Sequence, residues 1–225
     1  AFGVMGVVAP ASAVTNLLVN GDFESVGSPG EFTAESSGGS SDSLDALTTP
    51  EWAVYSAIPG WESTDGRGIE IQTAGTIPLT PNSGTKYVEL DSDPAGDSNS
   101  RMEQEVSDLT VGALYEFSFF FSPRSSDDGT NTIGWDFSPP DGEDGSVAGP
   151  GAGPPVTTVG HWTQIFDRFI ATSDTMTIAL YADGTEDKLG GFVDDVSLTL
   201  VPLPAGVFLI AGAFGLAGAV RRFAA

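Results

Sequence analysis

The sequence contains no cysteine, a single histidine and only eight lysines and arginines. Without cysteine no disulfide can stabilise the fold, so stability must come from the core and from any bound metal. A Ser-His-Asp site would have to use His161, which stands beside Trp162 at the expected start of a strand. A hydrolase of the paired-carboxylate type needs two acids that flank a cleft. Nothing singles out one such pair among the 31 acidic residues, so we expect a protein that is not an enzyme.

Acidic residues dominate the charge, which is −23 at pH 7. A surface of this sign repels nucleic acid and anionic lipid, because both carry like charge. It suits calcium, cationic partners or solubility alone. We therefore expect no nucleic-acid partner.

The first residues, 1–13, form an apolar stretch that ends in Ala11, Ser12 and Ala13. Small residues at these positions are typical of a signal-peptidase site, so we interpret residues 1–13 as the remnant of a secretory signal peptide. Glycines and Pro10 argue against the alternative, a first core strand. The mature protein is expected to begin near Val14.

Residues 14–200 carry many short apolar segments separated by Gly, Pro, Asp and Asn. Leu17 to Val19 before an Asn20-Gly21 turn, and Trp52 to Tyr55, predict two short strands. This pattern predicts one all-β domain, a β-sandwich or jelly roll. Longer strands are predicted at Gly68–Gln72, Lys86–Leu90, Arg101–Val106, Leu114–Phe121, Asn131–Phe137, Trp162–Ile170, Thr175–Tyr181 and Phe192–Leu200.

Two segments predict loops, residues 25–50, rich in Ser, Gly and Asp, and residues 138–160, rich in Pro and Gly. The second loop contains Asp141, Glu143 and Asp144. These acids lack the fixed ligand spacing of an EF-hand, so a solvated acidic loop is favoured over a calcium site.

The C-terminal segment, residues 201–225, has three consecutive parts. A Pro-bracketed pentapeptide is followed by an uncharged run to Val220 and by Arg221-Arg222. As a helix, residues 206–220 would extend roughly 22 Å, short of a hydrocarbon core of roughly 30 Å. The arginines favour the cytoplasmic side, which leaves residues 1–200 outside. The Gly- and Ala-rich helix suits a transient membrane anchor; a buried core helix or a simple tail anchor are the alternatives.

This tail resembles the VPLPA variant of the PEP-CTERM sorting signals of Gram-negative bacteria. The resemblance implies recognition by an exosortase, a membrane protease-transpeptidase that acts at the Pro-containing motif. The protein would then be exported and delivered to the cell surface or the extracellular polysaccharide matrix. The residues that carry the resemblance are Val201, Pro202, Leu203, Pro204, Ala205, Arg221 and Arg222.

The body, from about Asn16 to Leu200, contains a series of ordered segments, NLLVNGDFE, PGW, GIEI, YVELD, MEQEV, YEFSF, SPR and FVDDVSL. In this order they resemble the galactose-binding-like jelly-roll family known as domain of unknown function 642. Members occur in plant cell-wall proteins and bacterial surface proteins. The resemblance implies a sugar-binding or matrix-binding module, although the plant members' cysteines are absent here.

The second resemblance also implies a structural calcium between the first and last strands. Glu24 and Asp195 would supply the carboxylates, and backbone carbonyls would complete the six to eight oxygens that calcium prefers. The alternative is that Asp22 and Glu24 are turn residues, and that Asp194 and Asp195 are successive strand positions.

Sugars are bound by aromatic faces and by planar polar groups. Tyr55, Trp61, Trp135 and Arg124 stand near predicted loop ends and are the candidate ligand-binding residues. For Trp61 a core position is the alternative, and for Arg124 a role as the buried partner of a carboxylate. Trp52 and Trp162 are expected in the core.

Three functions remain at this point. The first is a non-enzymatic protein of adhesion or matrix structure, sorted by an exosortase and held in the inner membrane by its helix before processing. The alternative is a calcium-stabilised carbohydrate-binding module with a specific glycan ligand. A glycan-active hydrolase is the least favoured. Self-association through exposed edge strands is a further expectation, opposed by the acidic surface.

Overall fold

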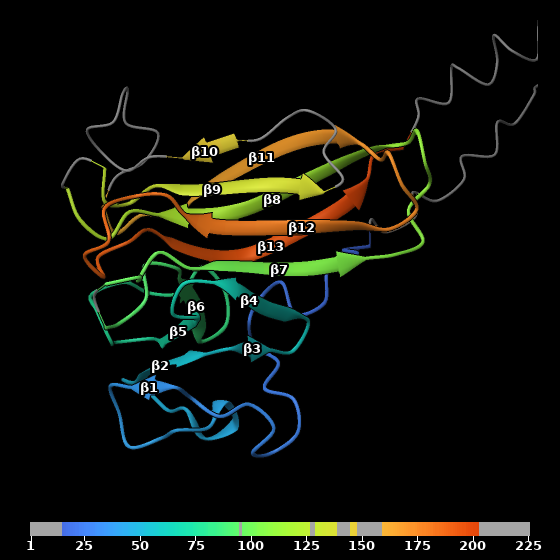
Figure 1. The fold of residues 1–225 in the computed structure, drawn as a ribbon. Coiled ribbons are helices and arrows are strands. Elements are labelled where there is room, and N and C mark those ends of the chain that lie inside the picture. The colour runs from blue at the N-terminus through green and yellow to red at the C-terminus, as the bar shows by residue number, and fades with distance from the viewer. Residues whose placement is uncertain (1–14, 95, 127–128, 139–144, 148–158, 203–225) are drawn as a thin grey trace, which may run out of the picture.

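The protein is a sandwich of two antiparallel β-sheets (Figure 1). The computed structural model describes residues 15–94, 96–126, 129–138, 145–147 and 159–202. One sheet has seven strands in the order β1 (Ser36–Ser37), β2 (Trp52–Tyr55), β5 (Ile69–Thr73), β6 (Lys86–Glu89), β13 (Phe192–Leu200), β8 (Leu114–Ser122) and β11 (Thr163–Ile170). The other has six in the order β10 (Gly145–Val147), β9 (Ile133–Ser138), β12 (Met176–Ala182), β7 (Arg101–Val106), β4 (Trp61–Asp65) and β3 (Ala57–Ile58).

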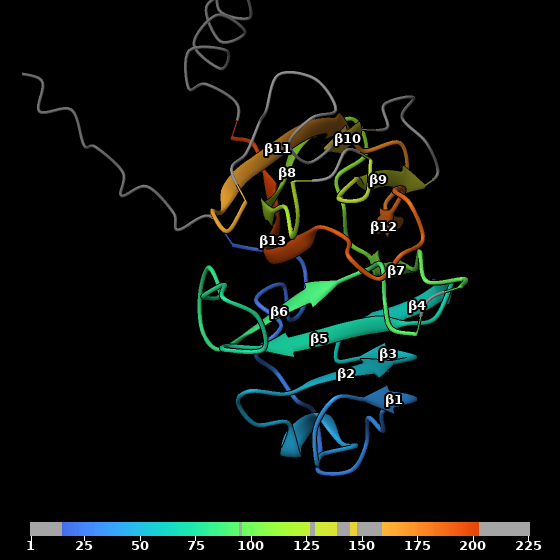
Figure 2. The same ribbon diagram turned by 90° about the vertical axis from the view of Figure 1, so that its left-hand side faces the viewer.

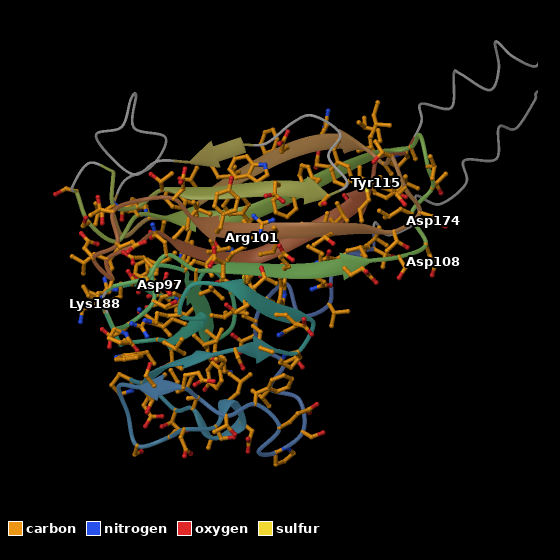
Figure 3. All side chains as sticks on the ribbon, viewed as in Figure 1. Asp97, Arg101, Asp108, Tyr115, Asp174 and Lys188 are labelled. Carbon is orange, nitrogen blue, oxygen red and sulfur yellow. The ribbon has the colours of Figure 1, made fainter. Side chains whose placement is uncertain are left out.

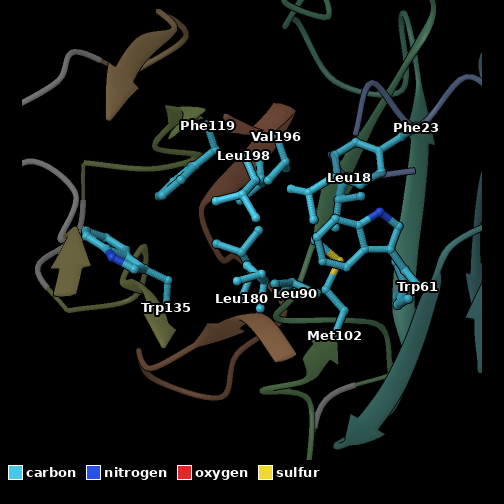
Figure 4. Close-up of a cluster of buried hydrophobic side chains, with 14 of the residues drawn as sticks. Leu18, Phe23, Trp61, Leu90, Met102, Phe119, Trp135, Leu180, Val196 and Leu198 are labelled. Carbon is cyan, nitrogen blue, oxygen red and sulfur yellow. The ribbon is translucent and has the colours of Figure 1, made fainter. Parts of the chain in front are cut away.

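Period-two alternation places one face of each sheet in the core between them. On β8 the inward residues Phe117, Phe119 and Phe121 are fully buried. Figure 4 shows how Trp61 and Leu180, from the six-stranded sheet, meet side chains of the other sheet in this core. The described residues form a core dense in aromatic rings, which stabilises a chain that has no disulfide.

At β5 and β6 the seven-stranded sheet is buried on its second face as well. Ile69 and Ile71 of β5 face the core, whereas Glu70 and Gln72 point to the outer face and are also buried. The connection between β5 and β6 covers this outer face, where Leu79 packs on Tyr87 and Phe192. Figure 2 shows β2, β5 and β6 in order beneath β13, β8 and β11. A polar group on this outer face therefore needs a protein partner.

The first described segment lies along the last strand. Asn16 Nδ2 donates to Val196 O at 2.9 Å, and Asn16 Oδ1 accepts from Leu198 N–H at 2.9 Å. Residues 16–19 do not form the predicted strand, because the Asn16 side chain hydrogen-bonds the backbone groups of β13 that a paired strand would use. The predicted turn after Val19 is confirmed, with Phe23 N–H donating to Asn20 O.

The all-β sandwich and the eight longer strands are confirmed, with ends shifted by a residue or two. The predicted loops contain short regular elements that the composition did not indicate. Residues 25–50 include β1 and a 3₁₀ helix, η1 (Leu44–Ala46), and residues 138–160 include β10. The predicted C-terminal helix lies outside the described residues. Within the described ranges, no helix is long and apolar enough to cross a membrane.

Candidate functional site

A pocket of about 280 Å³ opens on the outer face of the seven-stranded sheet. Its wall includes Arg124 from the end of β8, and we call it the Arg124 pocket. Strands β2 and β5, the connection between β5 and β6, and the loops before β7 and β13 supply the rest of the wall. The residues used below are Trp52, Glu70, Gln72, Asp93, Arg124 and Lys188.

A hydrogen-bonded network forms the floor of the Arg124 pocket. Gln72 Oε1 accepts from the Tyr87 hydroxyl at 3.1 Å, and Gln72 Nε2 donates to Glu70 Oε1 at 2.8 Å and to Glu89 Oε2. Arg124 Nη1 donates to both carboxylate oxygens of Glu89 and to Lys188 O at 2.9 Å. Because each group is held by two or more partners, the floor is a fixed set of donors and acceptors.

Two carboxyl groups share one guanidinium in this network. Burial raises the pKa of Glu89 well above its ordinary value, and the neighbouring Glu70 raises it further against the opposing effect of Arg124. Burial also raises the pKa of Glu70, opposed by the N–H of Asp93 and by Gln72. The pair is therefore more readily protonated than free glutamates, because a single cation does not compensate two buried negative charges.

Trp52 supplies the aromatic wall of the Arg124 pocket and is only partly buried. One side of its indole rests on Gly38, where a Cβ would come within 1.9 Å of Trp52 Nε1. Trp162 is also partly buried and donates from Nε1 to Thr80 O at 2.7 Å. The expectation that both tryptophans lie in the core is wrong, because both project from the outer face of the sheet.

Three predicted ligand-binding aromatics lie in the core instead. Tyr55 is 0% exposed, Trp61 1% and Trp135 6%. Trp61 Nε1 donates to Asn20 O at 3.3 Å and Trp135 Nε1 to Asp167 Oδ2 at 2.9 Å. The sequence placed these rings at strand ends but did not indicate which way each strand end faces. In this conformation none of them offers a ring face to a ligand.

Arg124 is the one predicted ligand-binding residue that lines the pocket. The alternative foreseen for it, the partner of a buried carboxylate, describes its contact with Glu89. Glu70 and Gln72 were not predicted. Two features of the sequence could have indicated a buried charge network. The chain has few cations, and the predicted strands GIEI and YVELD each carry acidic residues among apolar ones.

The two largest of the hollows that exceed the Arg124 pocket, of about 690 and 610 Å³, have a different chemistry. The first is rimmed by Asp65, Asp93 and Asp97 with Arg67 and has no aromatic wall. The second is lined by Trp61, whose ring is almost wholly covered, and by the partly buried Phe32, and no guanidinium lines it among the described residues. The Arg124 pocket is smaller but combines an accessible indole with amide, carboxyl and guanidinium groups.

Glu24 and Asp195, the predicted calcium ligands, hold two parts of one loop. Glu24 Oε1 accepts from the N–H groups of Thr85 and Lys86, both at 2.7 Å, and Oε2 accepts from Thr85 Oγ1 and Lys86 Nζ. Asp195 accepts from Asn82 Nδ2 at 2.6 Å and Ser83 Oγ at 2.7 Å.

These contacts determine how well the pair fits a shared ion. A carboxylate has about four lone-pair sites, and Glu24 uses all four on protein donors, one of them a lysine ammonium. Glu24 therefore does not fit as a ligand of a calcium shared with Asp195. Nor do any three acidic or histidine side chains converge on a metal position in the described parts of the chain. Calcium at this pair stays a prediction.

Most of the other predicted residues lie outside the part of the chain that the structure describes. Val201 closes on Leu114 O through its N–H at 2.9 Å and Pro202 is exposed, whereas Leu203, Pro204, Ala205, Arg221 and Arg222 lie outside the described residues. The same holds for Asp141, Glu143 and Asp144. The VPLPA motif thus begins directly after the end of β13.

The comparisons with known proteins concern the fold. No protein-family model and no curated protein matches the chain. Among solved structures, the chain is similar to the Stig cyclase Fisc from Fischerella sp. TAU, in complex with (3Z)-3-(1-methyl-2-pyrrolidinylidene)-3H-indole. The TM-score is 0.52 and the identity 18%, over 86% of this chain and 100% of that chain.

A second similar structure is TmCBM61 in complex with beta-1,4-galactotriose, with a TM-score of 0.49 and 19% identity over 83% of this chain and 99% of that chain. A third is a CBM4 domain, with a TM-score of 0.35 and 14% identity over 82% and 99%. At such identities the likeness shows the fold alone. The chain has a jelly-roll β-sandwich fold.

Proposed function

We propose that this protein is a non-catalytic carbohydrate-binding module of the cell surface or extracellular matrix, and that a sugar unit binds in the Arg124 pocket. The observation that carries the proposal is the partly buried Trp52 indole beside fixed polar groups of Glu70, Gln72 and Arg124. An indole stacks on the C–H face of a pyranose, while planar polar groups hydrogen-bond its hydroxyls.

The arrangement of carboxyl groups supports a binding role over hydrolysis. Glu89, which shares the Gln72 amide with Glu70, is fully buried and paired with Arg124. Asp93, the other carboxylate on the pocket wall, is paired with Lys188 Nζ at 2.6 Å. Among the described residues, Glu70 therefore has no free second carboxylate across the pocket, which a glycosidase mechanism needs.

The first experiment is a glycan array on the full chain, followed by calorimetry with the glycan that binds. Trp52→Ala should weaken the affinity at least about 10-fold, or about 1.4 kcal/mol, because the stacking face is lost. Glu70→Gln tests the polar floor with little change of shape. The matched control is Phe166→Ala, since Phe166 is 66% exposed on β11, outside the pocket.

The proposal fails if no glycan binds saturably, or if Trp52→Ala binds the glycan as tightly as Phe166→Ala does. Thermal unfolding of the Trp52→Ala protein checks that this variant is folded. If that variant does not fold, Lys188→Ala on the exposed rim replaces it.

We also propose that the C-terminal segment directs exosortase sorting, after transient anchoring in the inner membrane. The support is the residue pattern from Val201 to Arg222 and its position directly after the last strand. Mass spectrometry of the native C-terminus tests it. Mature protein that still carries Arg221-Arg222 would contradict processing.

A further inference from the structure

Two acidic loops meet at one end of the sandwich. One loop, residues 91–99 with residue 95 outside the described ranges, lies between β6 and β7, and the other, residues 183–189, lies between β12 and β13. Asp97 and Lys188, one from each loop, lie at this end in Figure 3, and Asp108 and Asp174 lie at the opposite end. The two loops contain six acids, Asp91, Asp93, Asp97, Asp183, Glu186 and Asp187, and one lysine.

Asp91 is the buried member of this group, with 0% exposure. Its Oδ2 accepts from the N–H groups of Asp187 at 3.2 Å and Leu189 at 3.0 Å. Its Oδ1 is buried and accepts no hydrogen bond of normal distance and angle, although the Ser98 hydroxyl lies close enough to lower the pKa of Asp91. A buried carboxylate oxygen without a partner is costly, so a further group is expected at Oδ1.

A second carboxylate converges on the same place. Asp187 Oδ1 accepts from Thr130 Oγ1 at 2.6 Å and from Leu189 N–H at 3.1 Å. The single Leu189 N–H is thus shared by Asp91 and Asp187, which brings their two charges together. Lys188 does not compensate them, because its ammonium is paired with Asp93.

Asn99 supplies a third oxygen. It lies directly opposite Asp91 in an antiparallel bridge, and residues so paired project to the same side. Asn99 Nδ2 donates to Gly184 O at 2.7 Å, while Asn99 Oδ1 is buried without a partner. Loop 91–99 therefore presents unpartnered oxygens of Asp91 and Asn99, and Asp187 of the other loop approaches Asp91 through the shared Leu189 N–H.

We propose that Asp91, Asp187 and Asn99 form a binding site for a hard divalent cation, calcium, that fastens loop 91–99 to loop 183–189. Calcium takes six to eight oxygens and accepts carboxylate, amide, backbone and water oxygens together. Two carboxylates and one amide are ligands of these kinds but supply fewer than six oxygens, and water completes the shell because Asp187 and Asn99 are only partly buried. The competing occupant of Asp91 Oδ1 is a proton shared with Asp187.

The experiment compares thermal unfolding and calcium calorimetry of the full chain after chelator treatment. Calcium at 100 times its dissociation constant should raise the Tm by about 5–10 °C for a domain of this size. Asp187→Asn should weaken calcium binding about 100-fold and reduce the shift at the same calcium concentration to about 1–2 °C, because one ligand charge is lost. Asn99→Ala should weaken it as well, and serves if Asp187→Asn does not fold.

Two variants are controls. Asp174→Asn removes an exposed acid at the opposite end and should keep the full shift. Glu24→Gln should also keep it, which separates this site from the Glu24 and Asp195 pair. The proposal is overturned if calcium does not shift the wild-type Tm, which is the result expected if a proton occupies Asp91 Oδ1 instead. It is also overturned if Asp187→Asn retains the shift, or if Glu24→Gln alone loses it.

Discussion

Replacing Arg124 by methionine tests the network beneath the Arg124 pocket. Arg124 is the partner of Glu89, and the two side chains are 25% and 0% exposed. Breaking a buried ion pair costs about 3–5 kcal/mol when one charge is left alone. Since Arg124 is a quarter exposed and Glu89 can take up a proton, we expect a loss of about 2–3 kcal/mol near pH 8. This corresponds to a fall in Tm of about 4–12 °C.

The loss should depend on pH with a defined sign. Burial raises the pKa of Glu89 and of Glu70 above their unfolded values, so the folded state binds more protons than the unfolded state above about pH 4.5. Stability from these groups is present at low pH and is lost as pH rises. Without Arg124 both pKa values rise further, so the Arg124→Met deficit should be smallest near pH 5 and largest near pH 8.

Urea unfolding followed by tryptophan fluorescence at pH 5 and pH 8 measures this. Arg168→Met is the matched control, because Arg168 pairs with Glu116 on the surface, with exposures of 57% and 36%. An exposed pair of this kind contributes about 0–1 kcal/mol. The reasoning is refuted if both variants lose equal stability, or if Arg124→Met loses more at pH 5 than at pH 8.

Three further predictions concern stability. Phe137→Ala should lower the free energy of unfolding in urea by about 3–5 kcal/mol, because the Phe137 ring stacks on Phe169 with 4.2 Å between ring centroids. A loss near 1 kcal/mol would mean a loosely packed core. Gly66→Ala should lower the Tm more than Gly112→Ala, although both have positive φ, since a Cβ at Gly66 would lie 2.2 Å from Asn99 O and one at Gly112 meets nothing; equal losses would contradict this. Burial and the adjacent Asp195 raise the pKa of Asp194 to about 7, so wild-type stability should fall between pH 4 and 8, and Asp194→Asn should flatten that slope.

The strands could be predicted because their signal is local. Alternation such as Ile69, Glu70, Ile71 states which residues share a face, and Gly, Asn and Pro mark where strands stop. Alternation does not state whether the second face is covered. Glu70 and Glu89 are therefore typical of solvent-facing positions in the sequence, yet the connection between β5 and β6 buries them.

The aromatic residues show the same limit. Trp61 follows a Pro-Gly turn and Trp135 lies near a predicted loop end, which favoured exposure, but each is the inward member of its strand. Trp52 is equally apolar and faces outward over Gly38. Burial of a tryptophan depends on which sheet lies across from it, and that depends on contacts distant in sequence. The convergence of Asp91, Asn99 and Asp187 has the same origin and left no local pattern.

The position of β13 has a consequence for the order of folding. This strand is the last in the described chain, yet it hydrogen-bonds to both β6 and β8 in the interior of the sheet. Until residues 192–200 pair with β6 and β8, the seven-stranded sheet consists of two separate halves, each with an open edge. Asn16 also has no groups to bind before then. The seven-stranded sheet is therefore complete only when its final strand pairs, so residues 192–200, which directly precede the VPLPA motif, join the two halves of the fold.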